Sequence, residues 1–221
     1  MFHIFENLHQ VRKKIDKVAA SSHRNGTDIH LVAVSKKQPR ERIIDALDAG
    51  QRLFGENRVQ DASAAWTDLK KQYPDIRLHL IGPLQSNKVK DAVALFDVIE
   101  TIDRPKIAEE LSREMNRQGR PLPCFIQVNT GEEEQKAGVI PAQLTALVSL
   151  CNDLNLNVRG LMCIPPEDES PALHFAFLKK LAARYAFQDL SMGMSADYEL
   201  AIPLGATYVR VGTGIFGSRD V

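Results

Sequence analysis

One lysine of this chain stands where a buried strand could deliver its side chain into a pocket. Lys36 directly follows the apolar run 29–35, which has the composition of a strand. The amine of a lysine in its neutral form can bond covalently to an aldehyde. The alternative is that Lys36 and Lys37 are solvated residues of a strand-to-helix loop, as most lysines are. Lys36 is therefore a candidate covalent ligand whose role depends on the residues around it.

Two segments near the carboxyl end are suited to an anion. Ser195 precedes the helix signal 196–201, so its hydroxyl could act together with the free N–H groups and positive dipole of a helix start. The alternative for Ser195 is a plain N-cap. In the segment 211–217, Gly212 and Gly214 lack side chains that would keep a phosphate from the backbone.

Arg210 lies inside the last predicted strand, two residues before Gly212. A charge at that depth needs a partner. The partner could be a carboxylate of the protein, or a heteroaromatic nitrogen of a ligand whose phosphate lies on the adjacent loops. A lysine amine, a phosphate cradle and a donor to a ring nitrogen together describe a site for pyridoxal 5'-phosphate, whose aldehyde forms a Schiff base with lysine.

Strand and helix signals alternate along the chain and must position these residues. Spacings of three and four predict an opening helix that ends near Ser21, Ser22 and Gly26. Its apolar residues are Phe2, Phe5, Leu8, Val11, Ile15 and Val18. The predicted strands are Ile29 to Ser35, Arg52 to Gly55, Arg77 to Gly82, Val98 to Ile102, Pro123 to Asn129, Val158 to Ile164, Gln188 to Gly193 and Thr207 to Gly212.

Amphipathic stretches between these strands indicate a parallel sheet with helices outside it. We therefore predict the α/β class, as a single (β/α)8 TIM-type barrel domain over residues 1–221, with an extra N-terminal helix over 1–25 packed on it. A doubly wound open sheet is the alternative. The barrel is favoured because the unusual residues follow predicted strands, where a barrel builds its site, and because the loops after strands seven and eight usually bind phosphate.

Several motifs resemble the pyridoxal phosphate homeostasis protein family, over about residue 30 to the end. They are Val32-Ala33-Val34-Ser35-Lys36, Phe54-Gly55-Glu56-Asn57, His79 to Lys88, Gly160-Leu161-Met162, Ser191 to Ser195, and Val209-Arg210-Val211-Gly212-Thr213. The resemblance implies that Lys36 forms a lysine aldimine and that Ser195, Gly212 and Thr213 hold the phosphate. It also implies that Arg210 faces the pyridine nitrogen, with Asn57 near the ring. An arginine partner makes the cofactor a weaker electron sink than an aspartate would.

Other reactive residues have plainer interpretations. His79 lies within the third predicted strand, where a core histidine is the simpler interpretation, and Lys88 lies where a helix would start. The stretch 129–138 resembles the family, yet as charge alone it indicates a solvated loop, and a second ligand contact through Lys136 is speculative. The three cysteines are too irregularly spaced for a disulfide framework or a zinc site, and Cys163 has no evident histidine partner.

Three functions are compatible with these residues. The first is a carrier or reservoir that holds pyridoxal phosphate as a lysine aldimine and serves intracellular cofactor homeostasis, with pyridoxal phosphate-dependent apoenzymes as possible recipients. The second is an amino acid racemase, because the alanine racemase barrel is similar. That enzyme needs a second base from an additional β domain, and we expect none here because the chain ends at Val221. The third is a barrel enzyme acting on another phosphorylated metabolite. We expect the carrier, with no catalytic residue and no metal.

Charge and hydropathy exclude several other classes. Twenty-eight basic and twenty-eight acidic residues are mixed along the chain, so no field of one sign favours nucleic acid or a membrane surface. No apolar stretch approaches the roughly 20 residues that span a bilayer, and no signal segment is evident. We therefore expect a cytoplasmic protein, and a monomer because no shared β domain is present.

Overall fold

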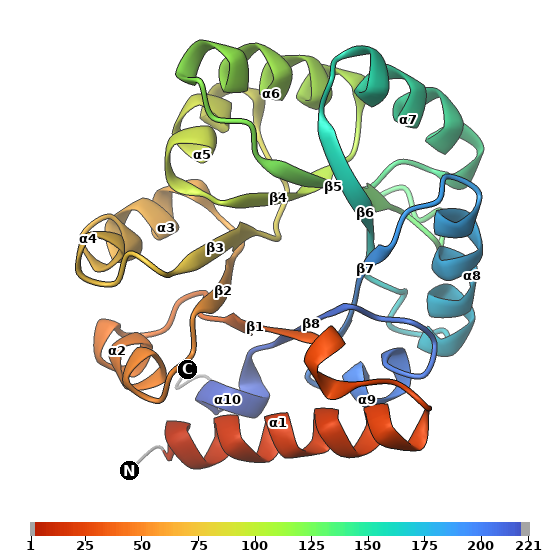
Figure 1. Cartoon of the computed structure of the whole chain (residues 1–221). Helices are drawn as coiled ribbons and strands as arrows, with labels where there is room; N and C mark the ends of the chain where they lie inside the picture. Colours follow the sequence, from red (N-terminus) through yellow and green to blue (C-terminus); the bar gives the residue numbers. More distant parts are fainter. Residues whose placement is uncertain (1–2, 218–221) are drawn as a thin grey trace.

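A closed barrel of parallel strands forms the centre of the protein (Figure 1). The structure is a computed structural model and describes residues 3–217. Its strands pair in chain order, and β1 pairs with β8 to close the barrel. Within the described residues the strands are β1 (His30–Val34), β2 (Leu53–Glu56), β3 (Arg77–Leu80), β4 (Val98–Ile102), β5 (Pro123–Val128), β6 (Asn157–Cys163), β7 (Asp189–Met194) and β8 (Tyr208–Val211). The predicted (β/α)8 barrel is confirmed, and the open sheet is excluded.

Helices surround the barrel on its outer side, as Figure 1 shows. They are α1 (Ile4–Ser21), α2 (Arg40–Asp48), α3 (Val59–Trp66), α4 (Leu69–Gln72), α5 (Val89–Leu95), α6 (Pro105–Gln118), α7 (Leu144–Asp153), α8 (Pro171–Ala183), α9 (Tyr198–Ala201) and α10 (Thr213–Phe216). Short 3-10 turns cover η1 (Gly26–Asp28), η2 (Ser86–Lys88) and η3 (Pro141–Gln143). Each strand is therefore covered from outside, as parallel sheets require.

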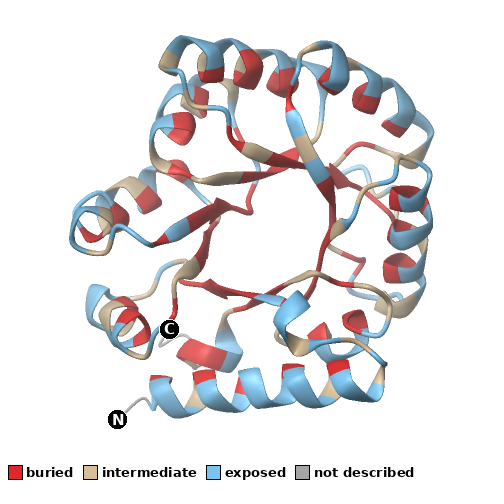
Figure 2. Cartoon of the chain, in the orientation of Figure 1, coloured by how far each residue is buried: buried red, intermediate tan, exposed pale blue. Residues whose placement is uncertain are grey.

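Burial follows the two-sided packing of the strands. In β3, Leu78, His79 and Leu80 are all buried, because one face of the strand meets the barrel interior and the other meets helices. Figure 2 shows the same pattern: buried residues run along the strands and along the inward faces of the helices. The ends of the strands are thus held rigidly, and the residues that follow them have fixed positions.

The opening helix α1 packs on the barrel beside α10 (Figure 1). Leu8, Val11 and Ile15 are buried on its inner face, and the Asn7 side-chain amide donates to the Ile215 carbonyl at 2.9 Å. Phe5 was expected on this face but is 68% exposed. Phe2 lies outside the described residues. The other apolar positions of the predicted pattern keep the spacing of three and four that one face of a helix requires.

Two boundaries near the carboxyl end differ from prediction. The helix signal 196–201 predicted a start at Ala196, but α9 begins at Tyr198, because residues 195–197 form a turn in which the Asp197 carboxylate accepts from the Met194 N–H at 2.6 Å. The sequence predicts a loop for the glycine-containing segment after β8, but this segment contains the single-turn helix α10. Both elements are too short for a periodic pattern to reveal their limits.

Gly160 should be intolerant of any side chain, because β6 lies against the backbone of β7 there. A Cβ at Gly160 would lie 1.8 Å from the Asp189 carbonyl oxygen, so the strands would have to separate. We expect Gly160→Ala to lower the free energy of unfolding by about 3 kcal/mol in urea titrations. The control is Gly119→Asn, at a left-handed position with open space around it, which should cost less than about 1 kcal/mol. Equal losses in the two variants would contradict the packing argument.

Candidate functional site

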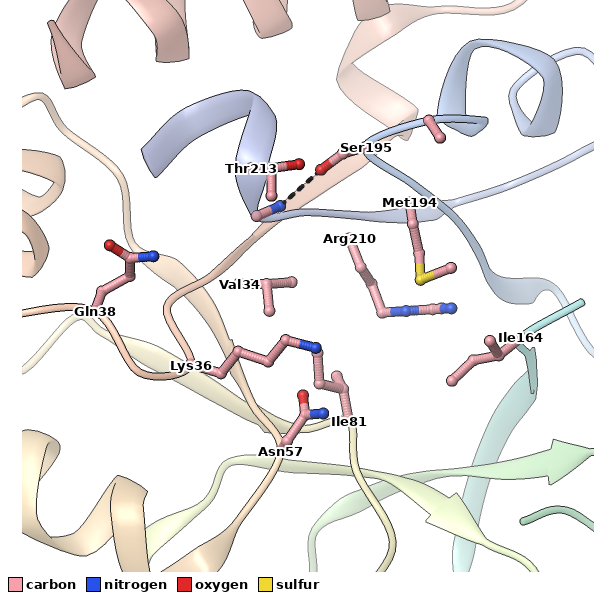
Figure 3. A pocket seen from close by; sticks show the side chains of 12 residues that line it. Val34, Lys36, Gln38, Asn57, Ile81, Ile164, Met194, Ser195, Arg210 and Thr213 are labelled. Atoms are coloured by element: carbon pink, nitrogen blue, oxygen red, sulfur yellow. Dashed lines mark hydrogen bonds between the residues drawn. The ribbon is translucent and has the colours of Figure 1, made fainter. Parts of the chain in front are cut away.

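A cavity of about 280 Å³ opens at the carboxyl ends of the barrel strands. The six residues predicted for the site all line it: Lys36, Asn57, Ser195, Arg210, Gly212 and Thr213. They follow or end four different strands, and only barrel closure brings them together. In Figure 3, Lys36 and Arg210 extend into the cavity from different sides, and Ser195 and Thr213 lie together at its rim.

Further residues complete the wall and were not predicted from the sequence. They are Val34, Gln38, Ile81, Ile164, Met194 and Ala196. Most of them are apolar and lie at or just after strand ends, which is the signal that could have identified them. An apolar wall with a few polar groups is the usual form of a small-molecule site.

Lys36 is held on a tight turn that directly follows β1. The Gln38 N–H donates to the Ser35 carbonyl at 3.0 Å, and Lys37 adopts a left-handed backbone with φ of 59°. Lys36 itself is half-buried, and its amine extends into the cavity near Asn57 and Ile81 (Figure 3). The turn therefore directs Lys36 inward and leaves Lys37 exposed.

A buried carboxyl group lies behind this turn. Glu56, at the end of β2, accepts hydrogen bonds from the Ser35 hydroxyl at 2.6 Å and from the Trp66 indole N–H at 3.1 Å. Burial raises the pKa of Glu56 above its ordinary value, although both hydrogen bonds and the charge of Lys36 act in the opposite direction. Apart from the place of Glu56 in the motif Phe54-Gly55-Glu56-Asn57, no sequence pattern indicates this group.

The Ser195 hydroxyl joins the loops after β7 and β8. Its oxygen accepts from the Gly212 N–H at 3.1 Å and from the Gly214 N–H at 3.4 Å, the first of which is drawn in Figure 3. Ser195 is therefore not an N-cap; Asp197 occupies that position of α9. A Cβ at Gly214 would lie 2.9 Å from a Val211 methyl group, so only glycine leaves this turn undisturbed.

Arg210 enters the cavity from inside the barrel and is itself buried. One terminal nitrogen donates to the Ser191 hydroxyl at 2.6 Å, and the other donates to the Cys163 carbonyl at 2.8 Å. The Ser191 hydroxyl donates in turn to Glu100 at 2.6 Å. Of the two partners considered for Arg210, the structure thus supplies a protein carboxylate, reached through one serine, while the guanidinium still lines the cavity.

His79 completes this group as a core histidine. Its Nδ1 lies 2.5 Å from Glu100 Oε1, and both side chains are buried. Burial alone would raise the pKa of Glu100, but hydrogen bonds from His79 and Ser191 and the charges of His79 and Arg210 lower it below its ordinary value. Glu100 is therefore an ionised carboxylate in the centre of the barrel.

The remaining reactive residues lie outside the cavity wall. Lys136 donates to the Pro165 carbonyl at 3.1 Å and pairs with Glu133 at 2.7 Å. Cys163 is buried, which raises the pKa of its thiol to about 12 and keeps it protonated at neutral pH. Within residues 3–217, no cluster of three or more His, Cys, Asp or Glu side chains could hold a metal ion. In the same range, no helix combines the length and apolar character needed to cross a bilayer.

Known proteins share this sequence and fold over nearly the whole chain. The family described as alanine racemase, N-terminal domain, matches residues 7–220. The pyridoxal phosphate homeostasis protein of Vibrio cholerae is 42% identical over 228 residues, covering 98% of this chain and 97% of that protein. The structure of PipY from Synechococcus elongatus with pyridoxal phosphate bound superposes with a TM-score of 0.85 at 37% identity, covering 97% of this chain and 100% of PipY.

Alanine racemase of Clostridium difficile shares the fold alone. It superposes with a TM-score of 0.70 at 14% identity, covering 98% of this chain but 58% of that enzyme. The barrel is therefore common to both proteins, and the sequence similarity points to the homeostasis proteins.

Burial of Glu56 predicts a pH-dependent effect of its replacement. The pKa of Glu56 is raised in the folded protein above an unfolded value of about 4.3. Below the unfolded value it is protonated in both states. As the pH rises from the unfolded pKa through the folded pKa of Glu56, the unfolded chain releases this proton first. Glu56 therefore lowers the free energy of unfolding as the pH rises through this range. Glu56→Gln cannot ionise at this position. We therefore expect its free energy of unfolding, minus that of the unmodified protein, to be more favourable at pH 7.5 than at pH 4. Urea titrations at the two pH values measure this difference.

The matched control is Glu114→Gln on α6. Hydrogen bonds from Arg117 and Gln118 lower the pKa of Glu114 to about 2, so its replacement should change stability in the opposite direction. If the free energies of unfolding of Glu56→Gln and the unmodified protein differ by the same amount at pH 4 and pH 7.5, the assignment of a raised pKa is refuted.

Proposed function

This chain belongs to the pyridoxal phosphate homeostasis protein family, and we propose that it binds pyridoxal 5'-phosphate as a Schiff base on Lys36. A single observation carries the proposal: the Lys36 amine, the Arg210 guanidinium and the Ser195–Gly212 turn line one cavity of about 280 Å³. These are the three groups that an aldehyde, a ring nitrogen and a phosphate require.

The residues of the cavity fit the cofactor. An added Cβ would lie 3.3 Å from the Val34 carbonyl oxygen at Gly212 and 2.9 Å from Val211 Cγ1 at Gly214, so this turn is tightly packed. It is exposed or half-buried at the rim, where an anion can reach it. Ser195 and Thr213 add hydroxyl groups there, close to the start of α10. Apolar side chains such as Val34, Ile81 and Ile164 provide walls for an aromatic ring.

Each polar residue then has a distinct role. Lys36 supplies the amine, Ser195, Gly212 and Thr213 hold the phosphate, and Arg210 donates to the pyridine nitrogen. Asn57 lines the same cavity as Lys36 (Figure 3), and we assign it a place near the ring. When bound, the cofactor can act as an electron sink, and a cationic arginine at its ring nitrogen weakens that property.

We propose a carrier or reservoir in preference to a racemase. Relatives at about 40% identity are named for homeostasis of the cofactor. A racemase needs a base on each face of the cofactor, and the ionisable side chains among the described cavity residues are Lys36 and Arg210 alone. Arg210 is permanently charged and donates to Ser191 and Cys163, so it cannot take up a proton.

Release to pyridoxal phosphate-dependent apoenzymes and a cytoplasmic, monomeric state are further parts of this proposal. The shared compartment follows from the proposed function, since a reservoir must meet its recipients there.

Replacing Lys36 should abolish the Schiff base and leave the fold intact. We expect the protein incubated with pyridoxal phosphate to be yellow. Schiff-base formation releases water, and borohydride reduction should leave the cofactor attached as a stable secondary amine to the peptide that contains Lys36. Lys36→Ala should lose both the colour and the modified peptide while its melting curve stays cooperative. Lys37→Asn is the control, because the neighbouring amine is exposed and asparagine tolerates its left-handed backbone. A colourless unmodified protein, or label at Lys37, would contradict the proposal.

A carrier should transfer its cofactor without catalytic turnover. We expect the loaded protein to activate a pyridoxal phosphate-dependent apoenzyme with about one equivalent of cofactor per carrier chain. With single amino acids, it should form at most stoichiometric product. The measurements are enzyme activity and chiral analysis of the amino acids. Sustained racemisation or transamination at about 1 s⁻¹ or faster, within the range of ordinary enzymes, would refute the carrier function and favour an enzyme.

A further inference from the structure

A line of buried hydrogen bonds crosses the barrel interior below the cavity. It runs from His79 in β3 to Glu100 in β4, then to Ser191 in β7 and Arg210 in β8. The heavy-atom distances are 2.5, 2.6 and 2.6 Å, and each of the four side chains is at most 3% exposed. Strands from opposite sides of the barrel are thus joined through polar groups.

The chemistry of the groups fixes the direction of every bond. Arginine only donates, so the Ser191 oxygen accepts from Arg210, and the Ser191 hydrogen is left to donate to Glu100 Oε2. The other carboxylate oxygen lies against His79 Nδ1, which donates to it. Both oxygens of Glu100 are therefore bonded, and Ser191 cannot reverse its hydroxyl without losing one of its two partners.

This arrangement fixes the charge as well as the position of Arg210. An unpaired guanidinium in the barrel interior would be strongly destabilising, and a carboxylate one hydroxyl away offsets it. The Cys163 carbonyl holds the second terminal nitrogen, so the plane of the guanidinium is set from two strands, β6 and β7. A group held in this way has little freedom to adjust to a ligand.

We propose that Glu100 is a positioning residue for the cofactor: through Ser191 it orients Arg210 toward the pyridine nitrogen and sets the electrostatic potential of the cavity. The inference rests on the proposed function. Glu100 does not line the cavity and therefore acts only through Arg210 and through its charge. His79 has a supporting role, since it holds the second oxygen of Glu100.

The sign of the electrostatic effect follows from the charges that surround Glu100. Inside the barrel these are His79 from β3 and Arg210 from β8, with the hydroxyl of Tyr208 also on β8, and Lys36 follows β1 at the cavity. Glu100 is the anion of this group; Glu56 does not line the cavity and hydrogen-bonds to Ser35 at the start of the Lys36 turn, where its effect is the same in every variant compared. Removing the charge of Glu100 makes the cavity potential more positive, which disfavours a protonated Schiff base.

The test is a pH titration of the absorbance of the loaded protein. The protonated Schiff base absorbs at longer wavelength than the neutral one, so the titration midpoint measures the potential at Lys36. We expect Glu100→Gln, which keeps the shape of the side chain, to shift this midpoint downward by on the order of 1 pH unit. Ser191→Ala keeps the charges of Glu100 and Arg210 but removes the hydroxyl that joins them. It should therefore weaken cofactor binding about 5- to 10-fold and shift the titration midpoint less than Glu100→Gln does.

Asp97→Asn provides the matched control. Asp97 precedes the same strand β4 and accepts from Lys70 and from the Leu78 N–H at 2.7 and 2.8 Å, but it lies at the opposite end of the barrel. Its replacement should lower the melting temperature of the cofactor-free protein without moving the midpoint. If Glu100→Gln is less stable but its absorbance titrates with the same midpoint as that of the unmodified protein, the inference is overturned.

Two further outcomes keep the inference separate from the proposed function. If the unmodified protein forms no Schiff base, the proposed function fails; if it forms one and Glu100→Gln titrates identically, only the role of Glu100 fails. If Glu100→Gln does not fold, Ser191→Ala decides, because unchanged affinity and an unchanged midpoint in that folded variant would overturn the inference.

Discussion

The pairing of β1 with β8 is the contact on which the candidate site depends. It sets Val32 of β1 opposite Arg210 of β8 and so brings the first strand of the chain beside the last. The turn that carries Lys36 then meets the turn that begins at Gly212, where a Cβ would lie only 3.3 Å from the Val34 carbonyl oxygen. Without closure, Lys36 and the turn at Gly212 would lie at opposite edges of an open sheet.

Two glutamates next to this site have opposite electrostatic surroundings. Glu56 is buried with two neutral hydrogen-bond donors, and its pKa is raised because burial outweighs these donors and the charge of Lys36. Glu100 is buried more completely, but it lies against His79 and near Arg210, and its pKa is lowered. Burial disfavours the charged form in both cases, and only a close opposite charge or charged donor reverses the effect. The barrel thus places one ionised carboxylate under the cavity and one carboxyl with a raised pKa behind Lys36.

The same barrel serves proteins with different activities, because a fold does not determine function. Alanine racemase of Clostridium difficile shares the architecture at 14% identity, and this chain covers 58% of that enzyme. What distinguishes the present site is its own chemistry. Among the described cavity residues, one lysine is the sole ionisable group that can exchange a proton, and a fixed arginine faces it across the cavity. Such a site favours the proposed binding of an aldehyde over proton transfer on both faces of a ligand.

The sequence by itself determined the strands and the barrel, and it predicted six candidate residues that all line one cavity. Strand limits were predicted within one or two residues, because continuous apolar runs are a local property of parallel strands. It could not determine that Ser195 bonds to Gly212 and Gly214 instead of capping a helix, nor that Phe5 points outward, since both depend on which segments meet. The partner of Arg210 was likewise undecided between a ligand and a carboxylate. Only the tertiary structure joins Arg210 to Glu100 through Ser191, because these residues lie on β8, β4 and β7 and meet only when the sheet closes.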